Sequence, residues 1–142
     1  FIHQSTKKHA KSAIIEKEIN LKGRTVLLVD DDMRNIYSLA KILRQKKMTV
    51  YVASNAEDAL KELDAHNDVE MILTDIMMPE MDGYELIKEI RKQERFKDIP
   101  IAALTANAMK GDKEKCLEAG ANDYVSKPID VDALFVMMKM WL

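Results

Sequence analysis

The sequence predicts an α/β protein in which helices cover both faces of a five-stranded parallel sheet. Short apolar runs alternate five times with segments whose apolar residues recur at helical spacing. The links between these segments are short, and such alternation favours a parallel sheet with right-handed crossovers. The chain has 142 residues, of which 47% are hydrophobic. That length and composition suffice for one domain with its own core.

The first half of the chain supplies two strands, each followed by a helix. Residues 25–29 and 49–53 are short runs rich in β-branched residues, which favour strands. A helix is expected over residues 33–46, because apolar residues there recur at positions i, i+3, i+4 and i+7. The second helix is expected to begin with a capping box formed by Ser54 and Glu57.

The second half continues the alternation with three more strands. Residues 71–75 are mostly apolar, as is typical of a central parallel strand, and residues 101–104 and 123–125 form two shorter runs. Helices are expected over 84–92, over 110–119 with a stop at Gly120, and from a cap at Asp130 to about residue 141. We expect the doubly wound, flavodoxin-like strand order 2-1-3-4-5, in which the first and third strands flank the switch point.

Composition excludes several classes of partner and location. The formal net charge is −2, so no global field favours nucleic acid or an anionic membrane, and we expect contact with neither. Cys116 is the only cysteine and cannot form an internal disulfide, which favours the cytoplasm. No apolar run approaches the ~20 residues that span a bilayer, and no secretion signal opens the chain.

The start of the chain differs from the rest. Residues 1–23 are basic at first and end at Gly23, which predicts a linker or the end of a preceding domain. Residues 24–142 are then one domain. The first residue is Phe1 rather than Met, so we expect a segment of a longer polypeptide, whose membrane anchorage elsewhere stays open.

Carboxylates follow two of the predicted strands at the point where each strand ends. Asp30, Asp31 and Asp32 follow the first run, and Asp75 closes the third. Because the carboxyl ends of parallel strands meet at one edge, Asp30, Asp31 and Asp75 are expected to share a crevice. Packed carboxylates repel one another unless a cation lies among them, and an all-oxygen set suits Mg²⁺. Asp32 is better explained as a helix cap.

Two further polar residues close predicted strands at the same edge. Thr105 ends the fourth run, where it is either a turn residue or a hydroxyl that binds a phosphoryl oxygen. Lys127 precedes Pro128 after the fifth run. Lys127 is either a surface lysine or a point charge that pairs with a carboxylate or a phosphoryl group.

Four ordered motifs make the chain resemble a known family. The motifs VLLVDDDMRN, MILTDIMMPEMDG, ALTANAM and DYVSKP stand in that order on matching predicted elements. In this order and spacing they resemble the receiver domain of two-component response regulators, over about residues 24–142. The first motif and the terminal MKMWL are most similar to receivers at the C-terminal end of hybrid sensor histidine kinases.

The resemblance implies a role for each residue of the predicted site. Asp75 is the phosphoacceptor, and Asp31, Asp75 and the Met77 carbonyl bind Mg²⁺ directly, with Asp30 acting through water. Lys127 pairs with Asp75 and then with the phosphoryl group. The remaining implied roles concern the conformational change, with Thr105 as the moving hydroxyl, Tyr124 as the aromatic switch and the Lys127–Pro128 bond as cis.

The resemblance also implies an activity and partners. The domain accepts a phosphoryl group from phosphohistidine on a histidine kinase or a histidine phosphotransfer domain. It catalyses its own phosphorylation and dephosphorylation without being a turnover enzyme. Partners are expected to dock near Met33 and Tyr37. Met77 and Asn107 flank the route of the hydrolytic water, and we expect apolar Met77 to orient that water poorly.

Three alternatives use similar architecture. A Mg²⁺-dependent phosphatase of the haloacid dehalogenase type carries Asp-x-Asp-x-Thr after its first strand. Asp30 and Asp32 fit that motif, but Arg34 replaces the threonine and Asp75 has no role. A flavodoxin is disfavoured because acids in the first loop would repel the FMN phosphate. A degenerate receiver that only binds proteins is disfavoured by the intact acidic set.

Overall fold

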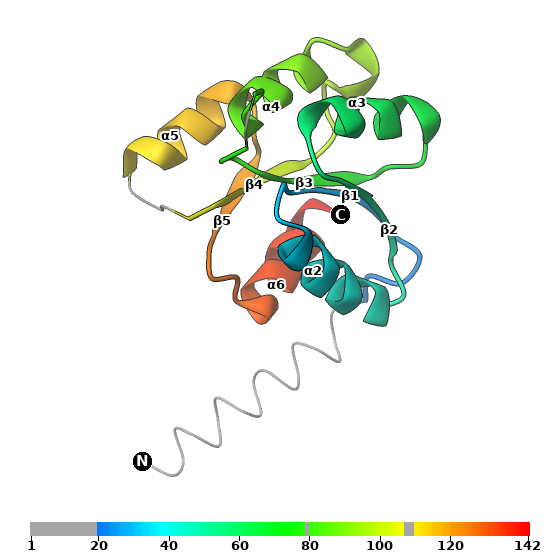
Figure 1. The fold of residues 1–142 in the computed structure, drawn as a ribbon. Coiled ribbons are helices and arrows are strands. Elements are labelled where there is room, and N and C mark those ends of the chain that lie inside the picture. The colour runs from blue at the N-terminus through cyan, green and yellow to red at the C-terminus, as the bar shows by residue number, and fades with distance from the viewer. Residues whose placement is uncertain (1–19, 79, 107–109) are drawn as a thin grey trace, which may run out of the picture.

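The computed structural model describes residues 20–78, 80–106 and 110–142, and it confirms the predicted sheet. Within these residues the five parallel strands lie in the order β2-β1-β3-β4-β5 (Figure 1). The strand bounds are β1 Thr25–Val29, β2 Thr49–Ala53, β3 Met71–Asp75, β4 Ile101–Thr105 and β5 Asp123–Ser126. Every predicted strand is therefore present, and the strand order matches the prediction.

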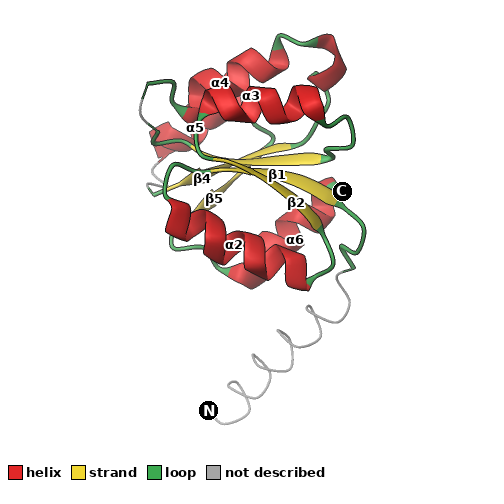
Figure 2. Ribbon diagram, turned by 45° about the vertical axis from the view of Figure 1, so that its right-hand side comes forward, coloured by secondary structure: helices red, strands yellow, loops and turns green. Residues whose placement is uncertain are grey.

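Helices cover both faces of the sheet. Figure 2 shows α3, α4 and α5 on one side of the strands and α2 and α6 on the other. The bounds are α2 Met33–Gln45, α3 Ala56–Ala65, α4 Gly83–Arg91, α5 Lys110–Ala119 and α6 Val131–Trp141, with a short 3-10 helix η1 at Glu94–Phe96. The 3-10 helix was not predicted. The arrangement is the doubly wound architecture expected from the alternating pattern.

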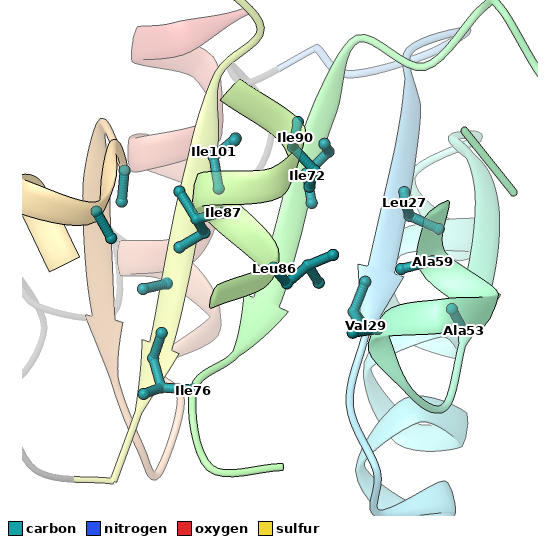
Figure 3. Packing of buried hydrophobic residues seen from close by; sticks show 14 of the residues in the cluster. Leu27, Val29, Ala53, Ala59, Ile72, Ile76, Leu86, Ile87, Ile90 and Ile101 are labelled. Atoms are coloured by element: carbon teal, nitrogen blue, oxygen red, sulfur yellow. The ribbon is translucent and has the colours of Figure 1, made fainter. Parts of the chain in front are cut away.

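Buried aliphatic side chains fix α4 against the middle of the sheet. Leu86, Ile87 and Ile90 of α4 lie over the sheet, where Ile72 of β3 and Ile101 of β4 face them (Figure 3). All five are fully buried. Burial of one such side chain contributes about 1.5–3 kcal/mol. This packing fixes the start of α4 against the carboxyl end of β3, where the predicted site lies.

The opposite face is covered by α2 and α6. Leu39 and Leu43 of α2 and Leu134, Phe135 and Met138 of α6 belong to one buried cluster with the strands. These positions recur at helical spacing, as the periodicity predicted. Because the two apolar clusters occupy the faces of the sheet, the polar side chains gather at its carboxyl edge.

The N-cap of α3 differs from the prediction. Asn55, rather than Ser54, precedes the helix, and its Oδ1 accepts a hydrogen bond from the Asp58 N–H at 2.7 Å. The Asn55 Nδ2 also donates to the Asp58 carboxylate at 3.1 Å. Two pairs fit the capping pattern, in which an acid follows a cap residue by three positions: Ser54 with Glu57, and Asn55 with Asp58. The pattern alone did not distinguish the two pairs.

Arg91 joins α4 to two other segments, residues 96–99 and 120–122. Its guanidinium donates hydrogen bonds to the side chain of Asn122 at 2.7 Å and to four main-chain carbonyls, those of Phe96, Lys97, Ile99 and Gly120. Burial lowers the pKa of Arg91, and Asp98 opposes that shift. No sequence pattern indicates this cluster, because four of its five acceptors are main-chain carbonyls that only the fold brings together.

The first described residues pack with the domain. Leu21 is 1% exposed within the cluster under α2 and α6, and the Gly23 N–H donates to the Lys47 carbonyl at 3.0 Å. Residues 1–19 of the predicted linker lie outside the described residues, and the boundary at residue 24 stays a prediction. Within the described part of the chain, the helices are too short or too polar to cross a membrane.

Candidate functional site

The predicted site residues meet at the carboxyl edge of the sheet. Asp75 closes β3 and Thr105 closes β4, while Asp30 and Lys127 each directly follow a strand. The residues Asp30, Asp75 and Thr105 are 2%, 5% and 5% exposed, whereas Asp31 is exposed. Parallel register puts these strand ends side by side, since Asp75 pairs with Leu104 of the next strand.

The three carboxylates form one cluster. One oxygen each from Asp30, Asp31 and Asp75 lies within 4.8 Å of the other two. The Lys127 Nζ lies 3.3 Å from Asp30 Oδ2 and 3.3 Å from Asp75 Oδ1. One cation therefore bridges two buried anions, and Asp31 adds a third negative charge at the solvent side.

Main-chain groups hold the two buried carboxylates in place. The Asp32 N–H donates to Asp30 Oδ1 at 2.9 Å, and the Met77 N–H donates to Asp75 Oδ1 at 3.4 Å. The Asp32 side chain instead caps α2 by accepting from the Arg34 N–H at 2.9 Å. Asp32 is thus the helix cap that the sequence predicted, and it does not join the carboxylate cluster.

The electrostatics of the site favour added positive charge. Burial raises the pKa of Asp75 above its ordinary value, and the negative charge of Asp30 raises it further, while Lys127 opposes both. Burial alone would lower the pKa of Lys127, but Asp75 and Asp30 outweigh it and raise the pKa. Lys127 is therefore charged at neutral pH. The raised pKa of Asp75 means that the site without a further cation disfavours its charged form.

The donor set fits a hard divalent cation. All the clustered ligand atoms are carboxylate oxygens, with no histidine or cysteine among the described residues of the group. Mg²⁺ prefers oxygen ligands, retains several waters and needs only one or two carboxylates. A cation here would offset the repulsion that disfavours the charged form of Asp75.

The two predicted switch residues lie beside the cluster. Thr105 is buried at the end of β4, and its carbonyl accepts from the Lys127 N–H at 2.7 Å. Tyr124 is half-buried, with the Lys113 Nζ 5.2 Å from the centre of its ring. The predicted cis bond between Lys127 and Pro128 is present. Asn107, predicted to flank the water route, lies outside the described residues.

Gly83 is a site-supporting residue whose role the sequence did not show. A Cβ at this position would lie 2.3 Å from the Asp75 carbonyl oxygen and 2.7 Å from the Ile76 Cα. The Gly83 N–H also donates to the Ile76 carbonyl at 2.9 Å. Helix α4 thus begins in direct contact with the backbone around Asp75, whereas the sequence placed the start of this helix at residue 84.

The exposed surface beside the cluster contains large apolar side chains. Met33, Tyr37 and Met77 are 62%, 74% and 74% exposed. A pocket of about 290 Å³ between α2 and the segment after β5 is lined by both Asp30 and Lys127. The site is therefore open to a partner rather than enclosed around a small substrate.

Comparison with known proteins gives consistent matches. The model of the response regulator receiver domain family matches residues 26–139. Hybrid signal transduction histidine kinase M of Dictyostelium discoideum is 39% identical over 118 residues, which are 80% of this chain but 5% of that protein. The chain therefore spans a small part of this relative.

Two solved structures share the fold over nearly their whole length. The receiver domain of the sensor histidine kinase PA1611 from Pseudomonas aeruginosa, with magnesium in its active site cleft, is 37% identical, with a TM-score of 0.77 and coverage of 84% of this chain and 97% of that one. The receiver domain of Ssk1 from Saccharomyces cerevisiae, in complex with the phosphotransfer protein Ypd1, is 30% identical, with a TM-score of 0.78 and coverage of 84% and 89%.

Proposed function

Since the chain belongs to the family of response regulator receiver domains, we propose that Asp75 is the residue that accepts the phosphoryl group. The domain serves two-component phosphorelay signal transduction. The observation that supports Asp75 most strongly is its place in a buried carboxylate cluster, with the Lys127 Nζ 3.3 Å away. Asp31 is exposed, and Lys127 contacts Asp30 at the same distance, so the resemblance of the MILTDIMMPEMDG motif favours Asp75 over Asp30.

Asp75 acts as the nucleophile in this proposal. One carboxylate oxygen attacks phosphorus in line, the bond from phosphorus to the donor nitrogen breaks, and an acyl phosphate forms. Lys127 is placed to bind a phosphoryl oxygen, because its Nζ already contacts Asp75. Asp30, Asp31, Asp75 and the Met77 carbonyl would hold Mg²⁺, which supplies positive charge that offsets the approach of two anions.

The same site is proposed to control a conformational switch. A phosphoryl group on Asp75 would favour the state in which the Thr105 hydroxyl binds it, and the population shifts by that difference in affinity. Tyr124 lies on the neighbouring strand β5, partly accessible, and is proposed to follow Thr105 inward. The Lys127 N–H donates a hydrogen bond to the Thr105 carbonyl, and this bond joins the end of β4 to the residue after β5.

We propose a histidine kinase or a histidine phosphotransfer domain as the phosphoryl donor. The Ssk1 receiver, a structural neighbour, is bound to a phosphotransfer protein. Met33 and Tyr37 offer exposed apolar surface beside the cluster, as a docking partner requires. The similarity to hybrid kinase M supports placement in a hybrid sensor histidine kinase, in the cytoplasm, where the lone Cys116 stays reduced.

The phosphatase alternative finds no support in the site. It required Asp30 and Asp32 to act together, but the Asp32 side chain caps α2 and the third cluster member is Asp75. It also left Asp75 without a role. The family match over residues 26–139 favours the receiver instead.

Intact mass after incubation with Mg²⁺ and acetyl phosphate tests the proposal. We expect one labile phosphoryl adduct, lost in Asp75→Asn and reduced when Mg²⁺ is chelated. Asp98→Asn changes an exposed aspartate away from the cluster and is the matched control, which keeps the adduct. An adduct that persists in Asp75→Asn, or turnover of a small phosphoester lost in Asp30→Asn, would contradict the proposal.

A further inference from the structure

The methionines divide sharply by exposure. Among the methionines whose side chains the structure describes, Met33, Met77 and Met140 are 62%, 74% and 73% exposed. The others are buried or half-buried, namely Met48, Met71, Met78, Met81, Met137 and Met138. A thioether needs access to react with a dissolved oxidant, so these three are the reactive candidates in the described part of the chain.

Met77 differs from the other two by its position next to the phosphoacceptor. It lies two residues after Asp75, and its N–H donates to Asp75 Oδ1 at 3.4 Å. Its neighbours Ile76 and Met78 are 3% and 8% exposed, so the packing of this loop is completed without the Met77 side chain. Met77 thus combines an exposed apolar side chain, outside both buried clusters, with a main chain that contacts Asp75.

We propose that Met77 is a site of reversible oxidation that shortens the lifetime of the phosphorylated state. A hydroperoxide transfers one oxygen atom to the Met77 sulfur. The O–O bond breaks, the sulfur loses two electrons, and the peroxide leaves as water or an alcohol. The product is a sulfoxide, which sulfoxide reductases return to the thioether. The inference rests on the proposed phosphorylation of Asp75.

The chemical change alters what the side chain does to water. A thioether is a weak acceptor and leaves the nearby solvent poorly ordered. A sulfoxide oxygen is polar and accepts hydrogen bonds, so it can orient a water molecule toward phosphorus. One hydrogen bond of ordinary net strength corresponds to an acceleration of about two- to tenfold in acyl phosphate hydrolysis. Oxidation would therefore turn the signal off sooner.

The test measures oxidation and phosphoryl lifetime in the same samples. The protein is treated with dilute hydrogen peroxide, and peptide mass mapping locates the sulfoxides. It is then phosphorylated with acetyl phosphate and Mg²⁺, and the decay of the adduct is followed by intact mass. Met77→Leu, Met33→Leu and Met140→Leu are treated in parallel, and each half-life is compared with that of the same variant without peroxide.

We expect peroxide to shorten the half-life about two- to tenfold in the unsubstituted protein, Met33→Leu and Met140→Leu, but not in Met77→Leu. Methionine sulfoxide reductase should restore the original half-life. Met77→Gln, which carries an oxygen acceptor, should decay fast without peroxide. A sulfoxide at Met77 with an unchanged half-life would overturn this inference and leave the proposed function standing. An equal response in Met77→Leu would do the same. No adduct before peroxide contradicts the proposed function as well.

Discussion

Replacing Gly83 with alanine tests whether helix α4 fixes the loop that follows Asp75. In the structure an added Cβ would stand 2.3 Å from the Asp75 carbonyl oxygen, and real contacts of this kind essentially never fall below 3.0 Å. The two backbones must therefore separate by about 0.7 Å or more. The two atoms nearest to the added Cβ, the Asp75 carbonyl oxygen and the Ile76 Cα, belong to the main chain, so no side-chain rotation relieves the clash.

The expected cost has a structural and a chemical part. Forcing one methyl group into a close-packed contact costs about 1–3 kcal/mol of unfolding free energy. The shift also moves Asp75 relative to the Lys127 Nζ, now 3.3 Å away. A misplacement approaching 1 Å at reacting groups slows a reaction up to about 100-fold. We therefore expect Gly83→Ala to be both less stable and slower to accept phosphate.

Urea denaturation and the rate of adduct formation from acetyl phosphate measure the two parts separately. Gly111→Ala is the matched control, because Gly111 lies in α5 with nothing within 4 Å of an added Cβ. It should leave the rate unchanged and raise stability by up to about 1 kcal/mol. Gly83→Ala with unaltered stability would refute the close contact. A destabilised variant phosphorylated at the normal rate would refute the coupling to Asp75.

Three further predictions concern the Arg91 cluster and the charge of Asp75. Arg91→Lys cannot satisfy the same acceptors and should lose about 2–4 kcal/mol of stability in urea, whereas exposed Arg95→Lys should lose under about 1 kcal/mol. In Mg²⁺-free buffer, burial and Asp30 raise the pKa of Asp75 in the folded state above its ordinary 3.8. The folded state then binds the proton more tightly than the unfolded state, so the free energy of unfolding falls as pH rises through that raised pKa. Urea denaturation at a series of pH values should show this fall in the unsubstituted protein and not in Asp75→Asn. Mg²⁺ at 100 times its Kd should add about 2.7 kcal/mol to stability, and Asp75→Asn should lose most of this gain.

The sequence predicted the strands and the acidic cluster because both depend on local patterns. Apolar runs set β1 and β3, and parallel topology then places the residues after them at one edge. Asp30, Asp31 and Asp75 were therefore expected at one edge of the sheet, and the structure confirms this. The residues alone left Lys127 as either a surface lysine or a partner of the site, and only the family resemblance implied its pairing with Asp75. The contact with Asp30 was not predicted.

Two of the features that escaped prediction depend on main-chain groups that only the fold brings close, and the third depends on an ambiguous local pattern. Arg91 binds carbonyls from two separate segments, residues 96–99 and Gly120, and no residue spacing encodes such a set. Gly83 was not predicted as a site-supporting residue, because only the folded chain shows that α4 touches the backbone of Asp75. Asn55 replaced Ser54 as the cap of α3, since two overlapping patterns met the same rule one residue apart.

Locating the phosphoryl group on the chain tests the central claim most directly. The domain is phosphorylated with acetyl phosphate and Mg²⁺, and the acyl phosphate is reduced with borohydride, which converts a phosphorylated aspartate to homoserine. Peptide mass mapping then reads the modified position. We predict homoserine at position 75 and an unmodified aspartate at positions 30 and 31. Homoserine at position 30 or 31 with Asp75 intact would contradict the assignment of Asp75 as the phosphoacceptor.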